Sequence, residues 1–489
     1  MKARKIFGAL KWSYLSYAVP NLILPLITII IARKLSPSDY GIFSMNIIFV
    51  GALCTIQAFG LREFIIKEND FNELKKSTLF YLSFLLGILS YVIILIISPF
   101  ISLFFQEEIV KNTLPILGLT VIFNALGTVH FAFLEKYFEF KKIFFIQILP
   151  LICVMLVTLP LAINGFGYKA LIYGELAKSI ALLTSYFLYH KWIPKLVFDS
   201  NYFKEAISFG KWISLERILE YSYANIDKLL LGAFFNASVL GLYALSRQII
   251  NILFGFISGG IVPVLLPLLS SVVHNKNIMI KTIKNIFENI IFLNISLLFF
   301  IAIASVSMFE IVLPNWDNIG FYILVLSLGE IAVRSINFSR EIYKIHNKPQ
   351  IYPKSLLINA CFAIIAYSVS MKFIGLLGFC LIRIMNDYLY LAVQYLSVKK
   401  IIDISKFGLL AQIIKGLFIN CIAFIICYYL FMSIENNFDI YINRNVQLFY
   451  ILIQILISIV LFIILQYSLN RRTFFLFYNN FLSVVGSKS

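Results

Sequence analysis

Charged residues are scarce in this sequence, and their scarcity excludes an ordinary soluble domain. Asp, Glu, Lys and Arg make up 13% of the 489 residues, against about 25% in soluble proteins. Apolar residues reach 61%. Apolar windows of about 20 residues, the length that crosses a bilayer, recur to the end of the chain. We therefore expect a polytopic membrane protein.

Cysteine and histidine are also rare, and their spacing excludes familiar covalent and metal chemistry. The six cysteines lie inside expected spans and form no CxxC or Cys/His pattern, so neither disulfides nor a zinc site is expected. The sequence has no HExxH, no glycine-rich phosphate loop and no GxSxG element. We therefore expect no catalytic residue, no metal, no cofactor and no direct use of ATP.

The hydropathy pattern predicts an all-α fold with about fourteen transmembrane helices. The first span lacks a small-residue cleavage site, so we expect it to be retained rather than removed as a signal peptide. The longest outer connection, Glu435–Asn445, is too short for a folded domain. The helices are expected at residues 12–33, 41–61, 79–104, 112–134, 143–164, 167–190, 208–232, 239–270, 286–312, 319–344, 353–373, 376–398, 409–434 and 446–468.

Lys and Arg are distributed unevenly between the two sets of connections. Of the 41, 28 fall on the side that includes both termini, 6 fall on the other side, and 7 lie within spans. Positive residues accumulate in the cytoplasmic loops of membrane proteins. We therefore expect both termini in the cytoplasm and an even number of spans. The same asymmetry accounts for the net charge of +17 without a nucleic-acid partner.

A weak internal repeat suggests two halves. A Lys-Trp pair recurs at residues 11–12 and 211–212, and glycine recurs at 41 and 241, so the offset is 200 without a gap. Five of the 33 aligned positions are identical. Six helices per half is an even number, so the halves would be parallel and related by an axis along the membrane normal.

This repeat leads to a domain prediction. We expect an N-terminal six-helix lobe over residues 1–200 and a C-terminal six-helix lobe over residues 201–400. Residues 401–489 would add two transmembrane helices, nearly bare of charge and facing lipid, and a cytoplasmic tail.

The segment Lys211–Gly232 carries charge on one face of an otherwise apolar helix. A charge at the bilayer centre costs about 2.5–3.5 kcal/mol on insertion scales, whereas Leu or Ile returns only about 0.3–0.6 kcal/mol. This helix therefore cannot lie alone in lipid and requires a bundle with a wet, polar interior. On a helical wheel a sector about 120° wide contains Glu216, Arg217, Glu220, Asp227 and Lys228.

Polar stripes recur on other expected spans. Glu330 and Arg334 are four residues apart in the helix over 319–344, and Arg383 and Asp387 have the same spacing in the helix over 376–398. Arg247 lies in the helix over 239–270. Such acid–base pairs could simply neutralise each other between packed helices. Because several spans share the feature, we favour a common hydrated cavity.

The candidate residues divide by charge. Guanidinium groups suit phosphate or carboxylate bidentately, so we expect an anionic head group as the ligand. The substrate-binding candidates are Arg217, Lys228, Arg247, Arg334, Arg383, Tyr223 and Asn21. The candidates for ion coupling or charge pairing are Glu216, Glu220, Asp227, Glu330 and Asp387.

Two segments resemble a known family. They are Ala32–Met45, with the sequence ARKLSPSDYGIFSM, and Phe209–Ile249. Both resemble the polysaccharide-transporter branch of the multidrug/oligosaccharidyl-lipid/polysaccharide (MOP) exporter superfamily. The second segment contains the family's Asn-x-Asp-x-Leu-Leu-x-Gly and Leu-Gly-x-Tyr patterns, at residues 225–232 and 240–243. Lys228 departs from that pattern, which commonly has an uncharged residue there.

This resemblance implies two six-helix lobes around a V-shaped cavity that opens alternately to each side. The implied activity is that of a flippase in the bacterial cytoplasmic (inner) membrane. Its substrate would be an undecaprenyl-diphosphate-linked oligosaccharide for O-antigen, capsule or exopolysaccharide, moved to the outer leaflet with a proton (H+) or sodium (Na+) gradient. Membrane lipids, a polysaccharide polymerase and glycosyltransferases are the implied partners.

Three alternative functions fit the sequence less well. A cation-coupled multidrug exporter of the same superfamily would favour carboxylates over arginines, and five cations within spans argue against it. A membrane-embedded polysaccharide polymerase or glycosyltransferase should carry a sizeable outer loop, which this sequence lacks. A purely structural scaffold would not need charged stripes on so many spans.

Overall fold

The computed structural model describes residues 26–68, 70–272, 275–373 and 375–402, together with isolated positions nearer the two ends. Within these ranges the chain is helical and has no strand, which confirms the predicted all-α class. The chain divides into two compact units. Unit 1 contains Met1–Leu245 and Ala363–Lys372, and unit 2 contains Ser246–Phe362 and Phe373–Ser489.

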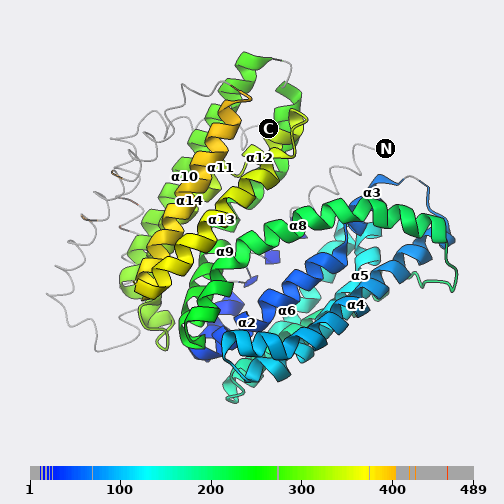
Figure 1. The fold of residues 1–489 in the computed structure, drawn as a ribbon, viewed down its shortest axis with the longest axis horizontal. Helices are drawn as coiled ribbons and strands as arrows, with labels where there is room; N and C mark the ends of the chain where they lie inside the picture. Colours follow the sequence, from blue (N-terminus) through cyan, green and yellow to red (C-terminus); the bar gives the residue numbers. More distant parts are fainter. Residues whose placement is uncertain are drawn as a thin grey trace. The chain divides into compact units, whose positions relative to one another are not determined.

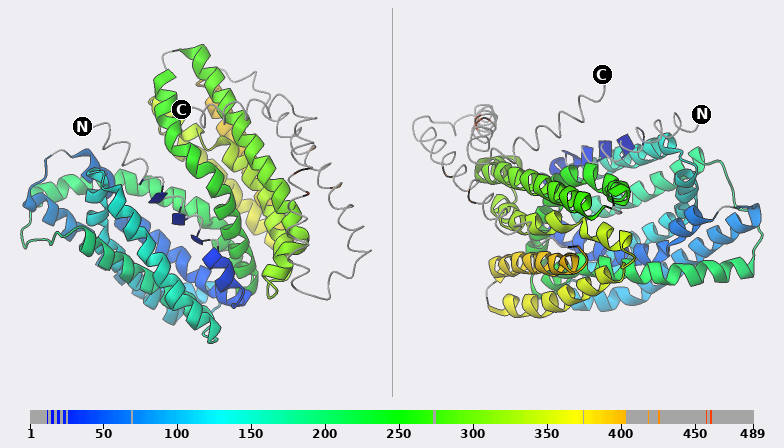
Figure 2. Two further views of the ribbon diagram at one scale, coloured as in Figure 1. Left: turned by 180° about the vertical axis from the view of Figure 1, so that it is seen from behind. Right: turned by 90° about the horizontal axis from the view of Figure 1, so that it is seen from above.

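Apart from the short α3, unit 1 is a bundle of long helices, each running back along its neighbour (Figures 1 and 2). The pairs α4–α5 and α6–α7 are consecutive in sequence, and α5 lies at the centre because it also packs on α2 and α7. Helix α8 packs on α2, α3 and α4. The helices are α2 (Pro37–Ala58), α3 (Leu61–Lys67), α4 (Glu73–Phe105), α5 (Ile109–Lys136), α6 (Phe140–Ile163), α7 (Tyr168–Tyr189) and α8 (Ser200–Phe234).

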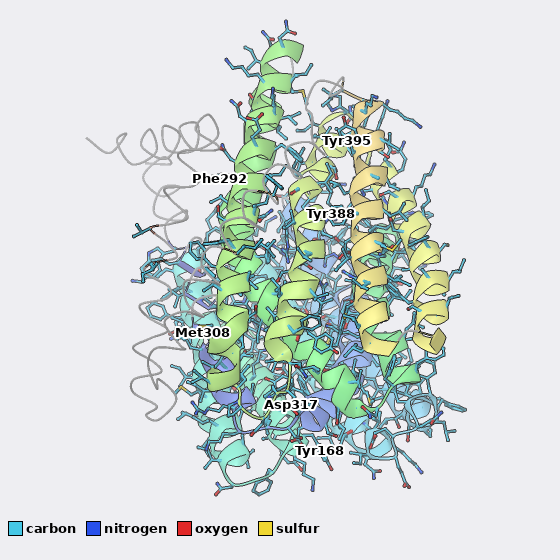
Figure 3. The ribbon with its side chains drawn as sticks, turned by 90° about the vertical axis from the view of Figure 1, so that its left-hand side faces the viewer. Tyr168, Phe292, Met308, Asp317, Tyr388 and Tyr395 are labelled. Carbon is cyan, nitrogen blue, oxygen red and sulfur yellow. The ribbon has the colours of Figure 1, made fainter. Side chains whose placement is uncertain are left out.

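Unit 2 is built around α11, which packs on both α10 and α14. Figure 3 shows its side chains, with Phe292 and Met308 on α10 and with Tyr388 and Tyr395 on α14. Helix α9 begins in unit 1 and continues into unit 2. The helices are α9 (Ala237–Val272), α10 (Lys276–Val312), α11 (Ile319–Ile336), α12 (Ser339–Ile345), α13 (Ile351–Phe373) and α14 (Gly375–Lys399). The part of α13 over Ala363–Lys372 belongs to unit 1.

Ten segments of the described part are long and apolar enough to cross a membrane. Helix α8 is not among them, and its run of charges is the reason. The helices predicted at 409–434 and 446–468 lie outside the described residues apart from isolated positions, whereas residues 26–32 of the helix predicted at 12–33 are described and helical. The total of fourteen spans and the division into lobes at residues 200 and 400 therefore stay predictions.

The second predicted helix does not stop near residue 61 but breaks and continues. Phe59 and Gly60 both adopt left-handed backbone conformations, with φ of 43° and 64°, and α3 starts at the next residue. Helix α8 lies against this break. A Cβ at Gly60 would stand 2.9 Å from Ile213 Cβ, and one at Gly210 would clash with the carbonyl oxygen of Phe59. The absent side chains allow α8 to approach closely.

One carboxylate caps two helices of unit 1. Asp39 Oδ2 accepts hydrogen bonds from the backbone N–H of Ser36 (3.0 Å) and from its hydroxyl (2.6 Å), at the start of α2. Asp39 Oδ1 accepts from the N–H of Tyr168 (2.7 Å), the first residue of α7. The negative charge therefore satisfies exposed donors at the positive ends of both helices. Asp39 also lines a cavity of about 520 Å³ with residues 164–169.

Candidate functional site

A buried charge cluster in unit 2 is centred on Glu330 of α11. One carboxylate oxygen accepts from Arg247 of α9, and the other accepts from Arg334 Nε at 2.9 Å. Arg334 also donates to Asn251 Oδ1 of α9 at 2.9 Å. Glu330 is only 2% exposed. One acid therefore holds two guanidinium groups, as a buried carboxylate requires.

Helix α14 adds a second ion pair to this cluster. Arg383 Nε donates to Asp387 Oδ2 at 3.2 Å, and both side chains are buried. Asp387 lies against α11, where a Cβ added to Gly329 would clash with its carboxylate. Arg383 is also close enough to Glu330 to interact electrostatically. The cluster therefore joins three arginines and two acids from α9, α11 and α14, all inside candidate spans.

Exposure distinguishes the three arginines. The side chain of Arg334 is 19% exposed, whereas those of Arg247 and Arg383 are 10% and 6% exposed. Arg334 is thus the guanidinium of this cluster that a ligand reaches most easily. Arg247 and Arg383 lie deeper and hold the acids in place.

A second polar site is an open groove in unit 1 between α2 and α8. Its volume is about 490 Å³. Arg217 contributes a cation whose side chain is 32% exposed, and it forms an ion pair with Glu63 of α3. Tyr221 donates to the carbonyl oxygen of Ile48 at 2.9 Å, which fixes the groove wall. The lining residues are Cys54, Thr55, Ala58, Arg217, Glu220, Tyr221 and Ala224.

The predicted charged sector of α8 divides in the structure. Arg217 and Glu220 line the groove, whereas Asp227 is fully buried and accepts from Tyr243 of α9 at 2.5 Å. Lys228 Nζ donates to Asn225 Oδ1 at 3.3 Å on its own helix.

The remaining candidates stand apart from the groove lining. Glu216 and Tyr223 are partly buried on α8 and are not among the residues that line the groove. Asn21 lies outside the described residues. The cluster and the groove thus each bring together part of the predicted set.

Two acids or bases that belong near these sites were not in the predicted set. Glu63 is one, because the sequence after Gly60 suggested a loop rather than a further helix. Lys178 of α7 is another, and it pairs with Glu175 at 2.8 Å. Lys178 and Glu175 both interact electrostatically with Cys54 in the groove wall. Glu175 and Lys178 are three residues apart on an apolar helix, and this spacing was the sequence signal that could have identified them. No group of three or more His, Cys, Asp or Glu that could hold a metal occurs among the described residues.

The helical fold places the protein among multi-pass membrane proteins with the fold of known exporters. It is similar to the lipid II flippase MurJ in its inward closed conformation, with a TM-score of 0.73 and 13% identity over 94% of this chain and 99% of that one. It is also similar to an inward-facing MATE multidrug transporter of the MOP superfamily. That match has a TM-score of 0.60 and 12% identity over 79% and 97% of the two chains.

Sequence comparison identifies the family. Residues 30–319 match the family described as polysaccharide biosynthesis protein. The chain belongs to this family, in the polysaccharide-transporter branch of the MOP superfamily, which confirms the resemblance seen in the sequence.

Curated relatives from bacteria and an archaeon match parts of the chain. The teichuronic acid biosynthesis protein TuaB of Bacillus subtilis is 28% identical over 38% of this chain and 39% of its own length. The lipopolysaccharide biosynthesis protein WzxC of Escherichia coli is 24% identical over 51% of each. The probable flippase AglR of Haloferax volcanii is 26% identical over 46% and 47%. The chain thus matches about half or less of the length of these relatives.

Proposed function

We propose that this protein is a flippase rather than an enzyme. It moves an undecaprenyl-diphosphate-linked oligosaccharide from the cytoplasmic to the outer leaflet of the bacterial cytoplasmic membrane by alternating access. The family membership and the relatives named for polysaccharide biosynthesis or flippase activity support this proposal. The cargo would serve O-antigen, capsule or exopolysaccharide assembly, with a polymerase and glycosyltransferases as pathway partners. Both termini would lie in the cytoplasm.

The observation that carries the proposal is the accessible guanidinium of Arg217 in the unit 1 groove. Glu63 pairs with this cation and holds it at the groove, where its side chain is 32% exposed. A diphosphate offers the same bidentate acceptor geometry as a carboxylate, with more charge, so it competes with Glu63 for Arg217. Thr55 and Glu220 add hydrogen-bonding groups for a sugar beside it.

Within unit 2, Arg334 is the proposed contact for an anionic group. It is the most exposed of the three arginines in the cluster, and Asn251 orients it. In this proposal Arg247 and Arg383, which are more deeply buried, hold the acids of the cluster in position. Lys228, Tyr223 and Asn21 remain proposed contacts.

The acids take different proposed roles in ion coupling. Glu330 and Asp387 are engaged by guanidinium groups, and Asp227 by the Tyr243 hydroxyl, so these three serve charge pairing. Glu220 lines the open groove and can be reached by a proton or sodium ion. Glu220 is therefore the preferred coupling residue, with Glu216 one helical turn away on α8.

The proposal is tested by complementation of a strain that lacks its own flippase for a surface polysaccharide. Arg217→Ala and Arg334→Ala should each lower surface polysaccharide while the amount of protein in the membrane stays unchanged. Arg62→Ala is the matched control, because Arg62 also pairs with an acid, Glu135, but its side chain is 45% exposed and lies outside the groove. Normal polysaccharide in both test variants would reject the site.

A further inference from the structure

The connection between α7 and α8, residues 190–199, is fastened along the surface of α4. We call it the strap. The strap has no regular secondary structure, yet side-chain and backbone contacts hold both its first half and its end in place. Three hydrogen bonds reach α4: Trp192 Nε1 to Glu73 Oε2 (2.9 Å), Lys195 N to Ser77 Oγ (3.0 Å) and Asp199 N to Thr78 Oγ1 (2.9 Å).

A histidine pair forms the first attachment of the strap. His190 Nδ1 lies 2.9 Å from Nδ1 of His130 on α5. His130 is fully buried, and its Nε2 has no hydrogen-bond partner among the described residues. Aromatic rings enclose the pair, with Phe187 and Trp192 centroids 4.5 and 5.5 Å from that of His130.

The Nδ1–Nδ1 contact fixes how many protons the pair can hold. With both rings neutral, one Nδ1–H donates and the other Nδ1 accepts. One added proton goes to an Nε2 and leaves this hydrogen bond intact. A second added proton places N–H groups on both Nδ1 atoms. The bond is then lost, and two cations whose ring centroids are 5.0 Å apart repel each other.

The charges around the pair come from two neighbouring helices. Lys76 of α4 and Lys142 of α6 oppose a second positive charge at His190, while Glu139, the residue before α6, favours it. Glu139 is itself paired with Lys142 at 2.5 Å, and Glu73 of α4 with Trp192 of the strap. Burial is the largest influence and lowers the pKa of His190. The surroundings therefore resist full protonation at neutral pH.

We propose that His130 and His190 form a proton-binding site that fastens the strap to unit 1 and releases it when both imidazoles are protonated. The strap leads directly into α8, the helix that carries Arg217. Release of the strap therefore frees the N-terminal end of α8 from its attachment to α4 and α5. Acidification on the side of the membrane where the strap lies then changes how firmly α8 is held, independently of ligand binding in the groove. The inference does not depend on the identity of the transported molecule.

Hydrogen exchange of the full-length protein in lipid nanodiscs tests this. Peptides covering residues 191–199 should lose protection about tenfold between about pH 7.5 and about pH 5, after correction with an unstructured reference peptide. His190→Asn places an amide oxygen near the Nδ1 position that still accepts from His130 but cannot ionise. This variant should keep its protection at the lower pH.

Further variants keep the test decisive. His130→Asn places an amide donor opposite His190 and should behave like His190→Asn if that variant does not fold. His346→Asn in unit 2 is the control, since His346 hydrogen-bonds to Ile342 O at its own helix end and is far from the strap in sequence, and it should follow the wild type. An unchanged wild-type strap at the lower pH overturns the proposal. Equal loss of protection in wild type and in the folded asparagine variants does so too.

Discussion

Gly241 lies against Gly41 where the first turns of α9 and α2 cross. A Cβ added to Gly241 would stand 2.8 Å from the amide nitrogen of Gly41 and 2.7 Å from the carbonyl carbon of Pro37. A Cβ added to Gly41 would stand 2.8 Å from Cα of Ala237. Residues 37 and 41 become 237 and 241 at the 200-residue offset of the repeat, so the contact is reciprocal. Reciprocal contacts of this kind arise about a local two-fold axis.

This crossing predicts different effects for two glycine substitutions on the same helix. Gly241→Ala should destabilise the protein by about 1–3 kcal/mol, because the new methyl group meets backbone atoms that cannot rotate away. Gly255→Ala is the matched control. Among the described residues no atom lies within 4 Å of its Cβ position, so the substitution should be neutral or stabilising by up to about 1 kcal/mol. Thermal unfolding in detergent measures both, and equal melting temperatures would contradict the crossing.

The double cap at Asp39 predicts a stability loss spread over two helices. Asp39→Ala removes acceptors from the N-termini of α2 and α7 and should cost about 1–2 kcal/mol. Hydrogen exchange should rise at Tyr168 as well as at residues 36–39. Asp39→Asn keeps one acceptor oxygen and should therefore lose less stability than Asp39→Ala. A rise confined to α2 would show that the bond to α7 is unimportant.

The unit 2 cluster predicts that alanine substitutions of the two arginines that share one acid have different effects. Arg247→Ala leaves buried Glu330 with one of its two guanidinium partners, and breaking a buried ion pair costs about 3–5 kcal/mol. We therefore expect little folded protein. Arg334→Ala removes the more exposed partner, so the protein should fold and lose transport instead. Comparing membrane protein level with surface polysaccharide separates the two, and the reverse pattern would refute this division of roles.

The histidine pair predicts a pH dependence of stability. Burial lowers the pKa of His190 below its ordinary value of 6.5. Below about pH 6.5 the unfolded chain then binds more protons than the folded chain, so stability is lost as the pH falls toward the folded-state pKa. Melting temperatures from about pH 8 to about pH 5 should decline in the wild type and decline less in His190→Asn. Parallel curves would exclude a contribution from His190.

Helix positions were largely predictable from the sequence, because apolar length and turn residues are local signals. Helix α4, expected at 79–104, extends over Glu73–Phe105, and α14, expected at 376–398, extends over Gly375–Lys399. The break at Phe59–Gly60 was missed because the charged residues after it resemble a loop. Asn72 caps α4 several residues before the apolar run begins, which explains its early start.

Ion pairs were predictable only within a helix. The Glu330/Arg334 and Arg383/Asp387 pairs both form, because a four-residue spacing places two side chains on one helical face. The partners of Arg217 and Arg247 are 154 and 83 residues away in sequence. No spacing rule reaches that far.

The sequence by itself determined a helical membrane protein of the polysaccharide-transporter branch, with charges that lipid alone would not tolerate. Only the tertiary structure decided that Glu63 holds Arg217, that Asp227 turns toward Tyr243 rather than the groove, and that one acid serves two arginines. The reason is physical. Hydrophobicity selects which segments are buried, but the rotation of each helix about its axis depends on all of its neighbours at once, and that rotation chooses the partner of every charged side chain.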